Sequence, residues 1–183
     1  MDVIETPSHK TLTKKTLMDK IFLTLLAILT IGQVSCGNSN ETIKERAFPA
    51  KTGYVNDYAD VLSESQEKDL DLMIQKYESK SSVEIYVVTL DSSMSTLETF
   101  NSYILRLAGH WKIGKKDRRN GILIGISPHL QRVRISNGLG IDERLSDVET
   151  KRILNSIMFP EYQKARFYEG TKRGIEEIIE ILK

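Results

Sequence analysis

Residues 83–90 read VEIYVVTL, an almost unbroken apolar run rich in β-branched side chains. Such a run is typical of a β-strand that is covered on both faces. Residues 122–126 read ILIGI and have the same character, whereas QRVRIS at 131–136 alternates polar and apolar positions, as a half-exposed strand does. Because only residues 127–130 separate the last two runs, we predict that they form an antiparallel hairpin.

Helix starts flank these strands. Residues 63–66, 95–98 and 146–149 each carry the capping-box pattern, in which Ser is followed three residues later by Glu or Gln. Apolar residues at helical spacing follow each box, so we predict a helix after each. The third helix is expected to stop before Pro160, because the residue before a proline avoids the helical region. A last helix is predicted from the apolar spacing in 175–182.

The resulting order is helix, strand, helix, strand, strand, helix, helix. It predicts an α/β fold, a three-layer sandwich in which a mixed sheet of about four strands carries helices on both faces. Residues 51–183 are long enough to enclose one hydrophobic core, so we predict a single domain over this range.

An apolar stretch, IFLTLLAILTI at 21–31, precedes this domain. It is too short to span a bilayer but suits the core of a secretory signal. A small residue and then Cys36 follow, which resembles a bacterial lipoprotein signal with a lipidated cysteine. A plain signal peptide with an incidental Cys36 is the alternative. We predict a lipoprotein-type signal over 1–36, translation starting at Met18, and a flexible tether over 37–50.

Composition excludes several classes of protein. The chain has 26 Lys and Arg against 25 Asp and Glu, a formal net charge of +1. A general nucleic-acid binder carries a clear basic excess, so we expect no nucleic-acid partner. A single cysteine excludes both an intramolecular disulfide and a Cys-rich zinc site.

Candidate sites gather in three loops next to the predicted strands: 53–60, 111–121 and 137–147. Carboxylates and backbone carbonyls in such loops suit Ca²⁺ or Mg²⁺, which prefer oxygen ligands. The candidate ligands are Asp57, Asp142 and Asp147. Each also has an ordinary interpretation. Asp57 could form a turn, Asp147 could favour the positive end of its helix, and Asp142 could be solvated.

Several segments also follow one another in a characteristic order: VNDYADVLS at 55–63, WKIG at 111–114, NGILIGIS at 120–127, RVRISNGLGID at 132–142 and YEGTKRG at 168–174. Together they resemble the TPM domain family over residues 51–183. That family includes a plant thylakoid-lumen protein linked to photosystem II repair and many bacterial extracytoplasmic proteins.

The resemblance implies a compact α/β sandwich with an acidic site that can bind a divalent cation. Some members are reported as weak acid phosphatases, others as scaffolds or assembly factors. Asp57 and Asp147 match aspartates of the family pattern. Two positions depart from it. Arg119 stands where an aspartate is frequent, which replaces a possible ligand with a cation, and Asp142 stands where a glutamate is usual.

A phosphate group could be held by backbone N–H groups of glycine turns and by a neighbouring cation. The candidates are Asn120, Gly121, Gly138, Gly140 and Arg119, of which Gly138 and Gly140 match the family's Gly-x-Gly turn. The glycines could instead simply permit a tight turn, and the basic run around Arg119 could be a solvated loop. Catalysis would need a metal-activated water or an aspartate nucleophile, with Asp57 or Asp142 as the candidates.

Two functions therefore remain open. The first is a membrane-tethered, extracytoplasmic TPM-like domain that binds Ca²⁺ or Mg²⁺ and acts as an interaction or assembly module. It would be anchored in the bacterial cell envelope through lipid on Cys36 and would bind an envelope protein. The second is a weak, metal-assisted phosphomonoesterase, an acid phosphatase of low activity.

Overall fold

The computed structural model describes residues 48–115 and 117–183. They belong to one compact unit, Arg46–Lys183. The predicted signal sequence, the start at Met18, the lipidation of Cys36 and the tether up to residue 47 lie outside the described residues. No helix within the described ranges combines the length and the hydropathy that a membrane span requires.

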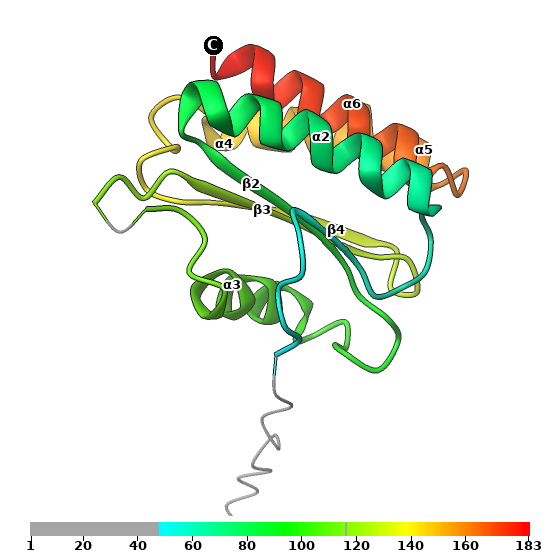
Figure 1. The fold of residues 1–183 in the computed structure, drawn as a ribbon. Coiled ribbons are helices and arrows are strands. Elements are labelled where there is room, and N and C mark those ends of the chain that lie inside the picture. The colour runs from blue at the N-terminus through cyan, green and yellow to red at the C-terminus, as the bar shows by residue number, and fades with distance from the viewer. Residues whose placement is uncertain (1–47, 116) are drawn as a thin grey trace, which may run out of the picture. The chain divides into compact units, whose positions relative to one another are not determined.

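Four strands form one sheet in the order β1-β2-β3-β4 (Figure 1). The neighbours β1–β2 and β2–β3 are parallel, and β3–β4 is the predicted antiparallel hairpin. The carboxyl ends of β1, β2 and β3 therefore lie at one end of the sheet, and that of β4 lies at the other. The strands are β1 (Val55–Asp57), β2 (Glu84–Thr89), β3 (Gly121–Ser127) and β4 (Arg132–Asn137).

Helices cover both faces, which confirms the predicted three-layer α/β sandwich (Figure 1). One face carries α3 (Phe100–His110). The other carries α2 (Glu64–Ser81), α4 (Asp147–Arg152), the π-helix η1 (Ile153–Met158), α5 (Phe159–Tyr162) and α6 (Phe167–Ile181).

The two faces of the sheet build two hydrophobic clusters, because successive side chains of a strand point to opposite sides. Ile85 and Val87 of β2 belong to the cluster under α2 and α6, whereas Val88 belongs to the cluster over α3. Trp111 is buried in the second cluster, as its place at the end of a helical face suggests. The apolar runs 83–90 and 122–126, predicted to be strands with both faces covered, are thus covered by helices on both faces.

Two of the three predicted capping boxes form. The Ser63 hydroxyl accepts the Gln66 N–H, and the Ser63 N–H donates to Gln66 Oε1 at 2.9 Å. Ser146 and Glu149 repeat this exchange at the start of α4. Both helices begin directly after the predicted serine, so local side-chain chemistry decides where they start.

The box predicted at 95–98 was wrong. Helix α3 begins at Phe100, and its cap residue Thr99 makes no side-chain cap bond. Thr96 donates its hydroxyl to Glu98 Oε2 at 2.8 Å, so this carboxylate serves a turn before the helix. Residues of this type form hydrogen-bonded turns as readily as caps, and here the turn forms.

Two further predictions need correction. Pro160 does not end its helix, because the π-helix η1 precedes it and Pro160 falls in the first turn of α5, where a missing N–H is tolerated. The segment 53–60 is also not wholly a loop. Val55–Asp57 pairs with β2 as a short edge strand.

Candidate functional site

Asp57 ends strand β1, and both of its carboxylate oxygens accept hydrogen bonds from neighbouring residues. Its Oδ2 accepts the backbone N–H groups of Val61 and Leu62 at 2.8 and 2.7 Å. Its Oδ1 accepts the hydroxyl of Thr89, the buried residue paired with it on β2. The same Thr89 hydroxyl oxygen accepts the Ala59 N–H at 2.9 Å. The carboxylate therefore holds the β1–α2 loop against the end of β2, which is the turn-forming interpretation of Asp57.

The sheet topology separates Asp57 from the other two predicted metal ligands. Asp57 pairs with Thr89 at the carboxyl end of β2. Asn137 pairs with Ile122 of β3, which in turn pairs with Ile85 near the start of β2. Four residue steps separate these levels, about 13 Å along the strand. The chain leaves Asn137 in the direction away from Asp57. Asp142 and Asp147, both exposed, follow at that opposite end.

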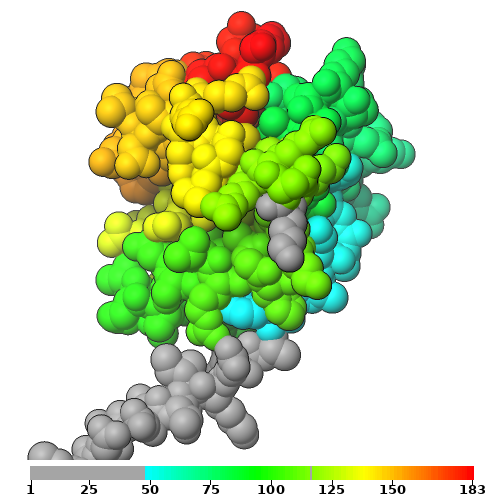
Figure 2. All heavy atoms as spheres, turned by 90° about the vertical axis from the view of Figure 1, so that its left-hand side faces the viewer, coloured from blue at the N-terminus to red at the C-terminus, as the bar shows by residue number. Residues whose placement is uncertain are grey.

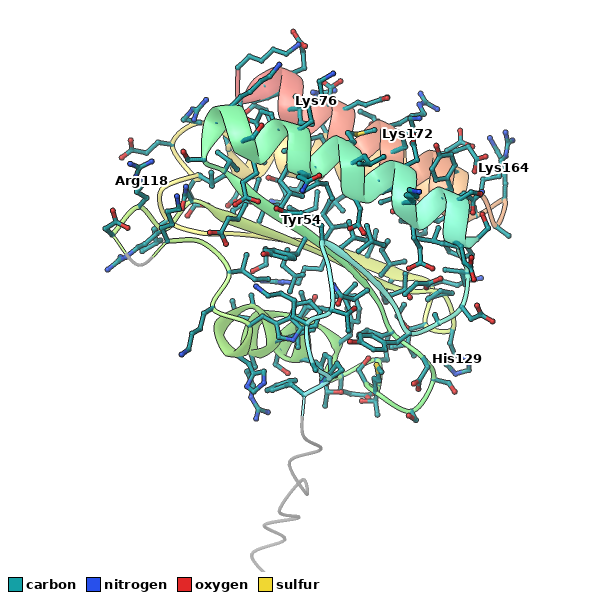
Figure 3. All side chains as sticks on the ribbon, in the orientation of Figure 1. Tyr54, Lys76, Arg118, His129, Lys164 and Lys172 are labelled. Atoms are coloured by element: carbon teal, nitrogen blue, oxygen red, sulfur yellow. The ribbon has the colours of Figure 1, made fainter. Side chains whose placement is uncertain are left out.

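These positions do not fit one cation site built from all three aspartates. Within the described ranges no three His, Cys, Asp or Glu side chains come together as a ligand group. Figure 3 marks the two ends of the sheet: Arg118 projects at the end where Asp142 and Asp147 follow β4, and His129 lies at the turn near the end of β1.

The predicted phosphate-binding residues do lie together, because the loop before β3 is hydrogen-bonded to the loop after β4. Figure 2 shows these two segments in contact on the surface. The Gly138 N–H donates to the Gly121 carbonyl at 2.8 Å, and the Gly140 N–H donates to the Arg119 carbonyl at 3.1 Å. A Cβ on Gly140 would lie 2.0 Å from the Arg118 carbonyl oxygen. The glycines thus allow two backbones to approach closely, and the N–H groups of Gly138 and Gly140 point into that contact.

Asn120 fastens the same loop to the end of α2. Its Oδ1 accepts the Lys115 N–H at 3.0 Å, and its Nδ2 donates to the Ser82 carbonyl. Both the oxygen and the nitrogen of this buried amide therefore have hydrogen-bond partners within the protein. Of the five predicted phosphate ligands, Arg119 has an exposed side chain and a positive φ of 49°.

Glu67 lies near several carboxylates around the β1–α2 loop. Burial, and then the nearby carboxylates of Asp57 and Asp71, raise the pKa of Glu67. A raised pKa means that ionised Glu67 is less favourable in the folded protein than in the unfolded chain. Its ionisation therefore lowers stability as the pH rises through the raised pKa.

We expect Glu67→Gln to raise the melting temperature by about 1–2 °C at pH 7, because the substitution removes that charge. The gain should vanish below about pH 4, where Glu67 of both folded and unfolded wild type is protonated. Thermal unfolding of both proteins from pH 3 to 8 measures this. Glu176→Gln, at an exposed position of α6 whose charge does not act on Glu67, is the control and should gain nothing. A pH-independent gain would contradict the electrostatic cause.

Tyr54 lies between the β1 edge of the sheet and α2 (Figure 3). Its ring stacks on that of Tyr86 with centroids 5.5 Å apart, and Lys51 Nζ lies 4.2 Å from the centroid of the Tyr86 ring. A hydrogen bond with the Glu78 carboxylate, and then burial, raise the pKa of Tyr54 to about 12. Tyr54 therefore stays protonated at neutral pH and offers no phenolate nucleophile.

Sequence reasoning missed the role of YEGTKRG, which is packing. A Cβ on Gly174 would lie 2.7 Å from Met158 Cγ, and one on Gly170 would lie 2.6 Å from the Tyr162 ring. These glycines let α6 approach η1 and α5 closely. The buried Thr171 lies within hydrogen-bond distance, 2.9 Å, of the Tyr162 hydroxyl. The signal was available, since two glycines four residues apart share one face of a helix.

A second missed feature is the buried carboxylate of Glu161. Arg173 Nη1 lies 3.1 Å from its Oε1, and Arg166 Nε lies 3.4 Å from its Oε2. A buried carboxylate is retained where cations pair with it, so this cluster ties α5 to α6. Its members are separate in the sequence, and only the close packing of the two helices brings them together.

Comparison with solved structures places this fold among bacterial domains. The N-terminal domain of a Porphyromonas gingivalis protein is 30% identical, with a TM-score of 0.64, over 72% of this chain and 82% of that one. The BA42 protein of Bizionia argentinensis is 22% identical, with a TM-score of 0.58, over 66% and 81%. The N-terminal domain of the Corynebacterium glutamicum cg2496 protein is 15% identical, with a TM-score of 0.54, over 74% and 84%.

No curated protein matches the chain. The likeness to the Bizionia argentinensis and Corynebacterium glutamicum structures shows that they share the fold of this chain. The family comparison is more specific, because the model of the TPM domain matches residues 55–181, from the first strand to the end of the last helix. That range contains each of the segments that carry the resemblance in the sequence. The chain belongs to the TPM domain family.

Proposed function

We propose that this TPM domain is a non-catalytic interaction module, tethered by lipid on Cys36 at the extracytoplasmic face of a bacterial membrane. The observation that carries the proposal is how the predicted site uses its polar groups. Asp57 directs one carboxylate oxygen at its own loop and the other at Thr89 of β2, and Gly138 and Gly140 donate their N–H groups to Gly121 and Arg119. A nucleophile or a phosphate cradle would need these groups free.

Exposed side chains at the end of the sheet that carries Gly138 and Gly140 suit a protein contact. Leu139 is 63% exposed and Val148 is 77% exposed. Leu139 stands between two glycines whose N–H groups are hydrogen-bonded to the neighbouring loop, so its position is held before any partner arrives. Preorganised apolar side chains lose little entropy on binding, and exposed Arg119, whose carbonyl accepts the Gly140 N–H, adds a cation on the neighbouring loop. We call Leu139, Val148 and Arg119 the loop face.

Cation binding stays a prediction, and the separation of Asp57 from Asp142 and Asp147 limits its form. A Ca²⁺ or Mg²⁺ ion would be held at one end of the sheet by fewer carboxylates than the sequence suggests. Affinity for these ions rises with the number of charged ligands, so we expect weak binding. The phosphomonoesterase alternative has no comparable support in the positions of these side chains.

The test is site-specific photocrosslinking in cells, with the crosslinker placed at Leu139 of the full chain. We expect a discrete crosslinked protein from position 139, and none from position 98, an exposed residue before α3 on the other layer. Cys36→Ala should move the chain out of the membrane fraction and abolish the adduct, because the tether brings the loop face to its partner.

Two results would count against the proposal. Equal labelling from positions 139 and 98 would show that the loop face is not a specific contact. An unchanged membrane fraction after Cys36→Ala would show that lipid on Cys36 does not anchor the chain.

A further inference from the structure

A cavity of about 580 Å³ lies between the C-terminal halves of α2 and α6. Its apolar walls are Met73 and Tyr77 of α2, Ile179 of α6, and Leu182 just beyond α6. These residues also pack on the main core, so the cavity is a notch cut into the edge of that core. Its volume falls within the range of small-molecule sites.

The position of the notch follows from how the two helices are joined. They run side by side in the same direction (Figure 1). Near their N-terminal ends Asp69 ties them together, accepting the Tyr168 hydroxyl at 2.7 Å and the Lys172 ammonium at 2.9 Å. The cavity lies beyond this tie, toward the ends of both helices.

The rim of the cavity is cationic. Lys76, Lys80, Arg144 and Lys183 line it, and no Asp or Glu side chain of the described residues does. Arg144 donates to the Leu182 carbonyl, and Lys183 pairs with Glu180. Lys76 and Lys80 form no ion pair within the described residues.

Helix dipoles alone do not account for this much charge. Each helix C-terminus carries roughly half a negative charge, so the two ends together carry about −1. The four cations exceed that even after Glu180 neutralises one of them. An anion at the rim would therefore be attracted, above all by Lys76 and Lys80.

We propose that this notch binds a single-chain anionic amphiphile of the fatty-acid type. The acyl chain packs on Met73, Ile179 and Leu182, and the carboxylate sits between Lys76 and Lys80. The lining favours such a ligand over a protein surface, because it comprises nine residues whereas a standard protein interface takes about 20–30 from each side. This inference does not depend on the loop face or on the tether.

The test uses the domain of residues 46–183, which holds both hydrophobic clusters of the described chain and is a compact unit. Its relatives from Porphyromonas gingivalis and Corynebacterium glutamicum were solved in solution as isolated N-terminal domains. Dodecanoate below its micelle concentration is titrated, with binding followed by calorimetry and by the NMR signal of the Met73 methyl group. Dodecyltrimethylammonium has the same alkyl chain with a positive head group, so it tests whether binding needs an anion. Inorganic phosphate is an anion without an alkyl chain, so it tests whether binding needs the acyl chain.

We expect dodecanoate to bind and to shift Met73, and the other two probes to leave it unmoved. Lys76→Glu with Lys80→Glu should weaken dodecanoate binding about tenfold or more, since two attractive charges become repulsive. Lys68→Glu, an exposed lysine of the same helix outside the cavity, is the matched control and should bind as wild type does.

Four outcomes would overturn the proposal. Dodecanoate binding that survives the double reversal, or that leaves Met73 unshifted, would place the ligand elsewhere. Absence of dodecanoate binding with retention on phosphatidylglycerol vesicles would assign the rim to a membrane surface. Dimerisation that the double reversal abolishes would assign the notch to a second copy of the chain.

Discussion

Replacing Gly125 with alanine is expected to lower the melting temperature by roughly 6–10 °C, about 2 kcal/mol of stability. Gly125 lies in the middle of β3 and faces α3. A Cβ there would lie 2.2 Å from Ile104 Cδ1 and 2.6 Å from Ile104 Cγ1. Both residues are buried, so Ile104 has no free space into which to turn. The alanine methyl must push α3 away from the sheet or strain the isoleucine.

Thermal unfolding of wild type and four variants checks this cause. Ile104→Val removes the nearest atom, so the pair Gly125→Ala and Ile104→Val should lose less stability than the sum of the single changes. Gly109→Ala, an exposed position of the same helix with nothing within 4 Å of its Cβ, is the control and should gain up to about 1 kcal/mol. Strict additivity of the pair would contradict direct contact between the two positions.

Truncating Asp57 is expected to lower stability even more. Asp57→Ala leaves the N–H groups of Val61 and Leu62 and the hydroxyl of Thr89 without their acceptor. We expect a loss of about 3 kcal/mol, because unpaired donors keep their desolvation cost. Asp57→Asn should lose clearly less, since its one oxygen can still accept both N–H groups while its amide faces Thr89.

This graded loss separates a structural role from a chemical one. If Asp57 only builds the turn, aryl phosphate turnover well below the melting temperature stays at background in wild type and in both variants. Likewise, millimolar Ca²⁺ should then raise the melting temperature of all three proteins by the same amount. Turnover, or a Ca²⁺-induced stabilisation, that disappears equally in Asn and Ala variants would restore Asp57 as a catalytic or metal-binding residue.

The elements that sequence reasoning placed correctly depend on neighbouring residues. The serines at 63 and 146 bond to groups three residues away, and runs such as 122–126 are apolar over a whole strand, so short windows contain the information. At residues 95–98 the same letters form a turn, because Thr96 competes for the Glu98 carboxylate. A three-residue edge strand is too short for any periodicity, and only pairing with β2 defines it.

The candidate site also has features that the sequence predicted and features that it did not. The family, the fold class and the grouping of the two glycine-containing loops were all predictable from the sequence. The uses of their polar groups were not, since they depend on which donor meets which acceptor. Asp57 reads as a free carboxylate in the sequence, and only the approach of Thr89 from the next strand shows that it is occupied.

Residue order by itself therefore determined the local elements and their succession, because caps, hairpins and apolar runs are set by interactions over a few residues. The tertiary structure alone decided that three aspartates lie at two ends of the sheet and that four cations surround one apolar notch. Such groupings depend on strand direction and on the angle at which helices pack, which distant residues set jointly through the shared core.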